Sequence, residues 1–196
     1  MKDKIRLAIF ASGTGTNAIN IIKYFRNHPE IEVFCLLSNK PDALVLQSIA
    51  PYDITTKIFN REDIYESDEI KSYLNWFQID YIILAGFLWL MPQNIIEEFP
   101  GKIINIHPAI LPGYGGKGMY GMKVHNAVIA NKEKETGISI HLVNDKFDEG
   151  KILFQAKINI DVTDTASPIA AKISQLEQEH FPRLIEEYIN RNTSEE

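Results

Sequence analysis

The chain has little cysteine, no long apolar run and no excess of positive charge, and each shortage excludes a class of protein. One cysteine in 196 residues, Cys35, excludes an intrachain disulfide and a cysteine-based metal site, and its apolar neighbours predict a core residue. The mostly apolar stretch 5–11 is too short for a bilayer span or for the core of a secretion signal. We therefore expect a cytoplasmic protein.

The charge balance is acidic, with 20 Lys and Arg against 26 Asp and Glu and a net charge of −6. A nucleic-acid surface would show a basic stripe, so we expect neither a nucleic-acid nor a membrane partner. A small anionic substrate stays possible, because backbone amides can hold a phosphate. His125, His141 and His180 lie far apart without zinc spacing, and we expect no metal.

Strands alternate with helices through the first 107 residues. This alternation predicts repeated βαβ units and therefore an α/β protein with a doubly wound, mostly parallel, Rossmann-like sheet. We expect one domain over residues 1–192 and a frayed tail at 193–196. The expected strands are 5–11, 31–38, 53–59, 80–85 and one ending at His107, and the expected helices are 18–27, 42–50, 66–77 and a short one from Pro92.

The remaining residues predict a different arrangement. Segments 137–143 and 152–160 alternate with period two, which indicates an antiparallel hairpin, and 119–130 has helical spacing. A long C-terminal helix should open at Pro168 after the cap candidate Ser167, and Pro182 should kink or break it. The four glycines in 112–118 predict a mobile segment over residues 113–121.

Asn105 and His107 form the most informative pair. They end an apolar strand two residues apart, so both side chains point to the same side at its carboxyl end, before Pro108 stops the strand. Ligands bind at that end of open α/β sheets. A histidine that titrates near neutrality and a neutral amide suit acyl chemistry, although a buried pair satisfied by backbone would have the same spacing.

A second candidate is the turn Gly13-Thr-Gly-Thr-Asn-Ala18 between the first strand and helix. Glycines and helix N-terminal amides can surround a phosphate. The turn also matches the loose G-x-G-x-x-G/A pattern of dinucleotide sites, but those need an acid at the end of the second strand, where the chain reads Leu36-Leu-Ser-Asn39. A phosphate monoester is therefore favoured, with a plain tight turn as the alternative.

Two further segments carry side chains suited to a site. The acid-rich loop 144–150 could place a carboxylate beside His107, although three acids in five residues also suit a solvated turn. His141, on an alternating strand, is interpreted as structural. Residues 87–92 follow a strand-end glycine and could line a slot for a flat heteroaromatic ring, or simply pack the core.

Taken together, these segments resemble the folate-dependent formyltransferases. The resemblance extends over nearly the whole chain, and within the family it is to the members that formylate glycinamide ribonucleotide in purine synthesis. Trp89, where relatives often have arginine, and the longer segment 115–121 depart from the family pattern. The matching strings are Ser12-Gly-Thr-Gly-Thr-Asn17, Ala85-Gly-Phe87, Asn105-Ile-His-Pro-Ala-Ile-Leu-Pro112, Gly137-Ile-Ser-Ile-His141 and Asp145-Lys-Phe-Asp-Glu-Gly150.

The resemblance implies a role for each matching position. Asn105, His107 and Asp148 would be catalytic. Gly15, Thr16 and Asn17 would hold the substrate phosphate, and Glu177 would contact the rest of glycinamide ribonucleotide. The co-substrate 10-formyltetrahydrofolate would lie against a larger set: Arg61, Leu88, Trp89, Leu90, Met91, Asn105, Asn144, Asp145, Lys146, Phe147 and Asp148.

The implied reaction is direct attack of the substrate amine on the formyl carbon. Asn105 and a charged His107 would stabilise the oxyanion, and Asp148 would orient His107 and help move a proton. The chain has no nucleophile-elbow motif, which suits a route without a covalent enzyme intermediate. Transfer to another amine, such as a nucleotide-sugar amine, formyltetrahydrofolate hydrolysis and a nucleotide-sensing role are the alternatives. A monomer or homodimer is expected.

Overall fold

The computed structural model describes residues 4–193 and divides into two units between Asn105 and Ile106. Of the expected tail at 193–196, Thr193 belongs to the last helix and residues 194–196 lie outside the described residues. Each unit has its own secondary structure.

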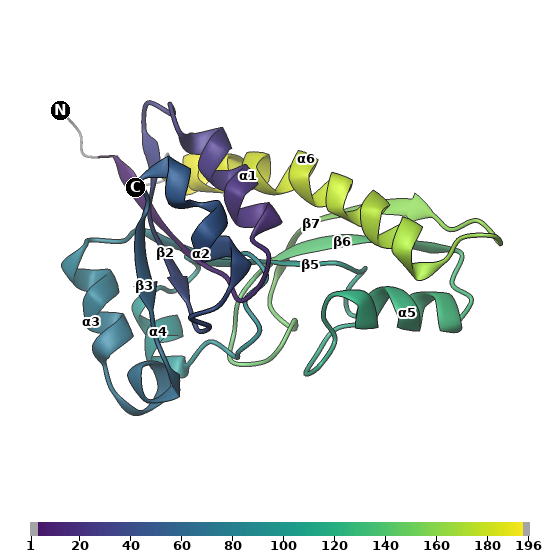
Figure 1. Cartoon of the computed structure of the whole chain (residues 1–196), viewed down its shortest axis with the longest axis horizontal. Helices are drawn as coiled ribbons and strands as arrows, with labels where there is room; N and C mark the ends of the chain where they lie inside the picture. The colour runs from purple at the N-terminus through teal and green to yellow at the C-terminus, as the bar shows by residue number, and fades with distance from the viewer. Residues whose placement is uncertain (1–3, 194–196) are drawn as a thin grey trace. The chain divides into compact units, whose positions relative to one another are not determined.

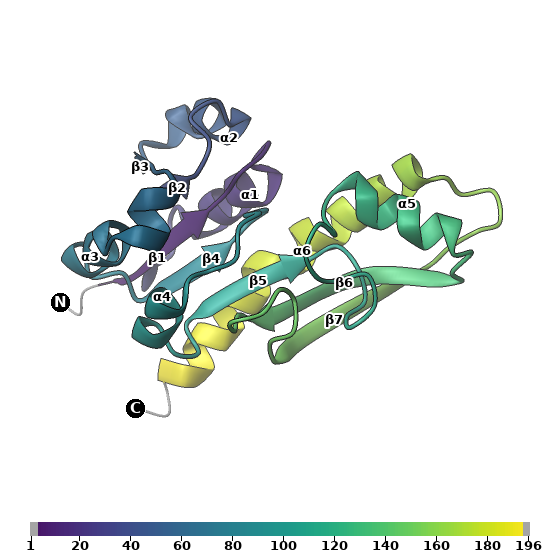
Figure 2. The ribbon, with the colours of Figure 1, turned by 90° about the horizontal axis from the view of Figure 1, so that it is seen from below.

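The first unit is built on five parallel strands in the order β3-β2-β1-β4-β5, of which β1, β4 and β5 are clearest in Figure 2. Residues 7–10 of β1 are fully buried, as in a central strand covered on both faces. The strands are β1 (Ile5–Phe10), β2 (Ile31–Ser38), β3 (Thr55–Ile58), β4 (Tyr81–Leu84) and β5 (Ile103–His107), of which the last two residues belong to the second unit. The helices are α1 (Thr16–Phe25), α2 (Leu44–Ser48), α3 (Glu69–Trp76) and α4 (Gln93–Glu98), with a 3₁₀ turn η1 (Ala50–Tyr52) and a π-helical turn η2 (Glu62–Glu66).

The strand order reverses beside β1, because β2 lies on one side of it and β4 on the other. Helices α1 and α2 lie to one side of these strands, and α3 and α4 lie to the other (Figure 1). Such a reversal opens a crevice at the carboxyl ends of the two strands. The turns that follow β1 and β4 are therefore the positions in this unit where a ligand is expected.

Helix boundaries in the first unit differ from those predicted. Helix α1 begins at Thr16 rather than residue 18, because the preceding Gly15 adopts a left-handed φ of 83° and serves as its N-cap. The expected helix 42–50 is the shorter α2 followed by η1, which has proline in its first turn. Strand β2 has the predicted bounds, and Cys35 within it is fully buried, which raises the pKa of its thiol to about 12.

The second unit consists of two antiparallel strands and two helices: β6 (Glu135–Leu142), β7 (Ile152–Asn159), α5 (Met122–Ala130) and α6 (Ala166–Thr193). Helix α6 runs along the β6–β7 ribbon and also contacts α5 (Figure 1). The predicted α/β class, mostly parallel strands, antiparallel pair and long C-terminal helix are confirmed.

Two expectations for the second unit need correction. Helix α6 begins at Ala166, one residue before the expected cap Ser167, and it continues through Pro182 without a break. Pro182 and its neighbour Phe181 are buried, and this packing holds the helix together where one backbone hydrogen bond is missing. Helix α5 begins three residues later than predicted, because Gly121 has a φ of 52° that a helix does not allow.

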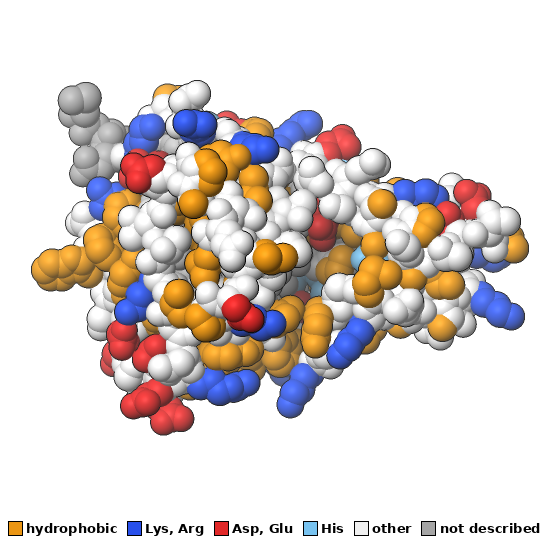
Figure 3. Space-filling view, viewed as in Figure 1, with side chains coloured by type: hydrophobic (Ala, Val, Ile, Leu, Met, Phe, Trp, Pro, Cys, Tyr) orange, Lys and Arg blue, Asp and Glu red, His pale blue; other side chains and the backbone are white. Residues whose placement is uncertain are grey.

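Figure 3 shows acidic and basic side chains intermixed over the visible face. No helix within residues 4–193 combines the length and the apolar character needed to cross a membrane.

Candidate active site

His107 ends β5, where the sequence places it, and its side chain is 4% exposed. Asn105 is half-buried two residues earlier on the same strand. Because side chains alternate along a strand, positions 105 and 107 lie on the same face of β5.

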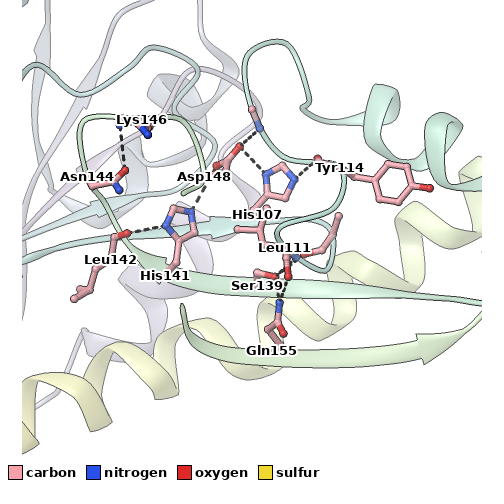
Figure 4. A network of polar contacts seen from close by, with 12 residues as sticks. His107, Leu111, Tyr114, Ser139, His141, Leu142, Asn144, Lys146, Asp148 and Gln155 are labelled. Carbon is pink, nitrogen blue, oxygen red and sulfur yellow. Dashed lines mark hydrogen bonds and ion pairs between the residues drawn. The ribbon is translucent and has the colours of Figure 1, made fainter. Parts of the chain in front are cut away.

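Asp148 belongs to the same unit as His107, and its carboxylate faces the imidazole (Figure 4). Its Oδ2 lies 3.5 Å from His107 Nδ1 and accepts a hydrogen bond from the Gly116 amide at 2.9 Å. The residue has a φ of 58°, a left-handed conformation that aspartate tolerates better than most residues. The acid-rich loop is therefore more than a solvated turn, because it holds a largely buried carboxylate against the imidazole.

The second nitrogen of His107 is also engaged. Nε2 lies 2.7 Å from the Tyr114 carbonyl oxygen, which can only accept, so Nε2 carries the proton and donates it. In a neutral His107, Nδ1 is then the basic nitrogen and faces the Asp148 carboxylate. A proton taken up at Nδ1 would be stabilised by that carboxylate.

Burial decides the charge of His107. Burial lowers the pKa of His107, and the Asp148 carboxylate and the Tyr114 carbonyl, which act in the opposite direction, do not offset it. The imidazole is therefore neutral near pH 7 in the protein without substrate, and the charged form expected at the oxyanion requires His107 to take up a proton during the reaction. Burial also pushes the pKa of Asp148 upward, but His141, His107 and the Gly116 amide together bring it below its usual value.

His141 was interpreted as structural, and the structure places it on the other oxygen of Asp148. Its Nε2 lies 3.6 Å from Asp148 Oδ1, while Nδ1 lies 2.8 Å from the Leu142 carbonyl oxygen (Figure 4). Asp148 thus stands between two buried imidazoles. The period-two alternation of 137–143 was the available signal, because it places Ser139 and His141 on one face of β6.

A hydrogen-bond network fixes the segment that follows His107. Ser139 Oγ donates to the Ala109 carbonyl at 2.7 Å and accepts from the Leu111 amide at 2.9 Å. Gln155 Nε2 donates to Ser139 Oγ at 2.8 Å and to the Leu111 carbonyl at 3.0 Å. The β6–β7 ribbon therefore holds residues 109–111 in place, and with them the backbone next to the catalytic candidate.

The turn at Gly15 lies in the first unit, between β1 and α1. A Cβ at Gly15 would collide with the Val45 side chain, and its φ of 83° also favours glycine. Thr16 and Asn17 are the first residues of α1, whose first turn contains no acid. Amides at such an end have no intrahelical acceptor, so the turn suits an anion.

Asn39, beyond the end of β2, occupies the place where a dinucleotide site would have an acidic residue. Asn39 follows this strand and is 9% exposed. Its Oδ1 accepts a hydrogen bond from Ser12 Oγ at 2.7 Å, and Ser12 Oγ in turn accepts the Leu88 amide at 3.2 Å. The position that would hold an acid in a dinucleotide site instead ties together the two turns that follow β1 and β4.

The segment predicted to line a slot for a flat ring contributes Phe87 and Trp89 to an aromatic cluster, and the Arg61 guanidinium contacts this cluster. The Arg61 guanidinium lies 4.6 Å from the centre of the Trp89 ring, and Tyr65 donates a hydrogen bond from its hydroxyl to the Leu90 carbonyl at 2.7 Å. Phe87 and Met91 are buried, and their side chains pack in the core. Leu88, Trp89 and Leu90 are the partly exposed members of the stretch.

The remaining predicted positions belong to the second unit. Glu177 is half-buried on α6. In the acid-rich loop, Asn144 Oδ1 accepts a hydrogen bond from the Lys146 amide at 3.1 Å. Asp145 and Lys146 are exposed, whereas Phe147 is half-buried. His107 and Asp148 are thus brought together within one unit, whereas Gly15–Asn17, Arg61 and Leu88–Met91 belong to the other.

Comparison with known proteins gives consistent matches. A family profile described as formyl transferase matches residues 5–185. A phosphoribosylglycinamide formyltransferase of Bacillus subtilis is 30% identical, covering 95% of this chain and 96% of its own, and one of Haemophilus influenzae is 31% identical, covering 92% and 85%. The crystal structure of a phosphoribosylglycinamide formyltransferase from Bacillus halodurans has a TM-score of 0.81 at 32% identity, covering 92% and 93%.

The chloroplast phosphoribosylglycinamide formyltransferases of Arabidopsis thaliana and Vigna unguiculata are each 35% identical over 89% and 92% of this chain. The chain spans about three fifths of their length, 61% and 60% respectively.

Proposed function

Because the chain belongs to the formyl transferase family, we propose that it transfers the formyl group of 10-formyltetrahydrofolate to the amine of glycinamide ribonucleotide. The product would be formyl-glycinamide ribonucleotide in purine biosynthesis. The observation that carries the proposal is the buried contact between His107 and Asp148 at the end of β5. This contact supports the proposal, because His107 would act as a base and the Asp148 carboxylate would stabilise its protonated form.

The proposed chemistry begins with attack of the substrate amine on the formyl carbon. As the carbon–nitrogen bond forms, negative charge develops on the formyl oxygen and the amine becomes acidic. His107, neutral beforehand, takes up the proton at Nδ1, and Asp148 stabilises the resulting imidazolium. Asn105 and the charged His107 then stabilise the oxyanion, an effect worth about 10²–10³ in rate for one such donor.

The intermediate collapses when the folate nitrogen leaves with a proton. The proton delivered to that nitrogen comes from the His107 imidazolium, directly or through water, which returns His107 to its neutral form. Nothing in this sequence needs a covalent enzyme intermediate, and no metal is used in any step.

We assign the substrate phosphate to Gly15, Thr16 and Asn17, and the rest of glycinamide ribonucleotide to Glu177. The lack of an acid in the first turn of α1 supports the phosphate assignment. The folate would be bound by Arg61, whose guanidinium lies on Trp89, by the stretch Leu88–Met91, by Asn105 and by the loop Asn144–Asp148. The Met91 side chain is buried and cannot contact the ligand. Backbone groups of Leu88–Met91 would therefore form the hydrogen bonds to the edge of the pterin ring.

We also infer that residues 1–192 act as one formyltransferase domain, which the match over 5–185 supports. Three further points stay predictions: a reaction without a metal, a monomeric or homodimeric state, and a cytoplasmic location.

The test is turnover of 10-formyl-5,8-dideazafolate, followed by absorbance, with and without glycinamide ribonucleotide. We expect turnover that depends strictly on the amine. Release of formate without an acceptor would identify a hydrolase instead. Folate binding without turnover would identify another acceptor amine, such as a nucleotide-sugar amine.

A further inference from the structure

His125 is a buried imidazole that the proposed chemistry does not use. It lies on α5 and is 5% exposed. Its Nδ1 is buried without a hydrogen-bond partner, and no other residue within 4–193 forms a hydrogen bond with its ring. Buried polar groups are nearly always satisfied, so an imidazole with no protein partner requires an explanation.

The packing of α5 places His125 beside the segment that leaves His107. Val124 and Val128, on the same helix, form a buried cluster with Ala109, against which Tyr114 also packs. Ala109 comes two residues after His107, and Tyr114 supplies the carbonyl that accepts from His107 Nε2. His125 is therefore part of the structure that surrounds the catalytic imidazole in this unit.

His125 is neutral in this environment. Burial lowers the pKa of His125, and the proximity of His107 lowers it further. A proton on Nδ1 would create a buried N–H without an acceptor, which costs more than a buried lone pair on the same atom. The ring therefore carries its single proton on Nε2, and this N–H is a donor with no acceptor in the described protein.

We propose that His125 is a substrate-binding residue whose Nε2–H donates a hydrogen bond to an uncharged oxygen of the amine substrate. The acceptor would be a hydroxyl or a carbonyl, because a neutral imidazole offers one donor and no charge for a phosphate. In glycinamide ribonucleotide these groups are the ribose hydroxyls and the glycinamide carbonyl. This inference rests on the proposed function and adds a specificity contact to it.

Three substitutions test the inference through the kinetics of the amine substrate. His125→Gln can place an amide N–H near the position of Nε2 and should keep the Michaelis constant for glycinamide ribonucleotide within about twofold. His125→Asn places its amide near Nδ1 instead, and His125→Phe has no donor. Both should raise that constant about tenfold, as expected for one lost hydrogen bond, with kcat and the folate constant little changed.

Each outcome is decisive. Unchanged constants in the Asn and Phe variants would overturn the inference, and so would an equal rise in the Gln variant. If the Phe variant does not fold, as judged by its thermal midpoint, the difference between Gln and Asn decides. If the unchanged protein shows no amine-dependent turnover, the proposed function fails and this inference fails with it. If the unchanged protein turns over normally but the Asn and Phe variants have the same Michaelis constant as it does, only this inference fails.

Discussion

At the scale of single residues, Asp148 determines the chemistry of its surroundings. Its two oxygens face two imidazoles, and a backbone amide occupies one of them. A carboxylate in this position orients His107 and stabilises it only once His107 has taken up a proton. Since burial keeps His107 neutral beforehand, the stabilisation would, in the proposed mechanism, be available mainly when the amine has lost its proton.

Asp148→Asn removes that charge while keeping an oxygen for the Gly116 amide. We therefore expect an intact fold and a turnover number reduced by more than tenfold, since proton transfer by a positioned group contributes about 10²–10⁴. The measurement is kcat in the formyl-transfer assay together with the thermal midpoint. Glu149→Gln is the matched control, because Glu149 is exposed and paired with Lys146 in the same loop. Near-normal turnover in Asp148→Asn would remove Asp148 from the mechanism.

At the scale of elements, the connection from β1 to α1 depends on one backbone conformation. Gly15 is left-handed at the start of the helix, and the side chain of Val45 fills the space where a Cβ would be. A larger residue would therefore shift the first turn of α1, whose amides are assigned to the phosphate.

Gly15→Ala tests this connection. We expect a lower thermal midpoint, because a non-glycine residue in this conformation costs about 1–3 kcal/mol before the collision with Val45 is counted. The Michaelis constant for glycinamide ribonucleotide should rise more than tenfold. Gly13→Ala is the control, since a Cβ there meets nothing within 4 Å and its φ is not in the left-handed region. Equal behaviour of the two variants would contradict the phosphate assignment.

Some secondary-structure elements could be predicted from the sequence, and others depend on tertiary packing. Strand β2 was predicted with its observed bounds, because eight largely apolar residues between polar turns have few alternatives. The start of α6 was not predicted. The break considered at Pro182 is absent, because tertiary packing of Phe181 and Pro182 outweighs the local cost of proline. The contact of His141 with Asp148 joins strand β6 to a loop residue seven positions later. The spacing of these residues in the sequence does not indicate that the loop folds back onto the strand.

At the scale of the whole molecule, net charge and buried histidines have opposite effects on stability as the pH falls. The chain carries a net charge of −6 at pH 7 and has an isoelectric point of about 5.4, so acidification towards that point reduces self-repulsion and should stabilise the fold. Any loss of stability between neutrality and pH 5.5 must therefore come from particular groups.

The histidines supply such groups, since burial lowers the pKa of both His107 and His125. In the unfolded chain they take up protons near their ordinary pKa of about 6.5, while the folded protein keeps them neutral to a lower pH. Below about pH 6.5 the unfolded state thus binds more protons, and stability must fall until the folded pKa values are passed. We expect the thermal midpoint to be level above pH 7.5 and to drop by a few degrees by pH 5.5. His125→Gln removes one of the two groups and should make the drop shallower, so a slope equal to that of the unchanged protein would show that His125 titrates alike in both states.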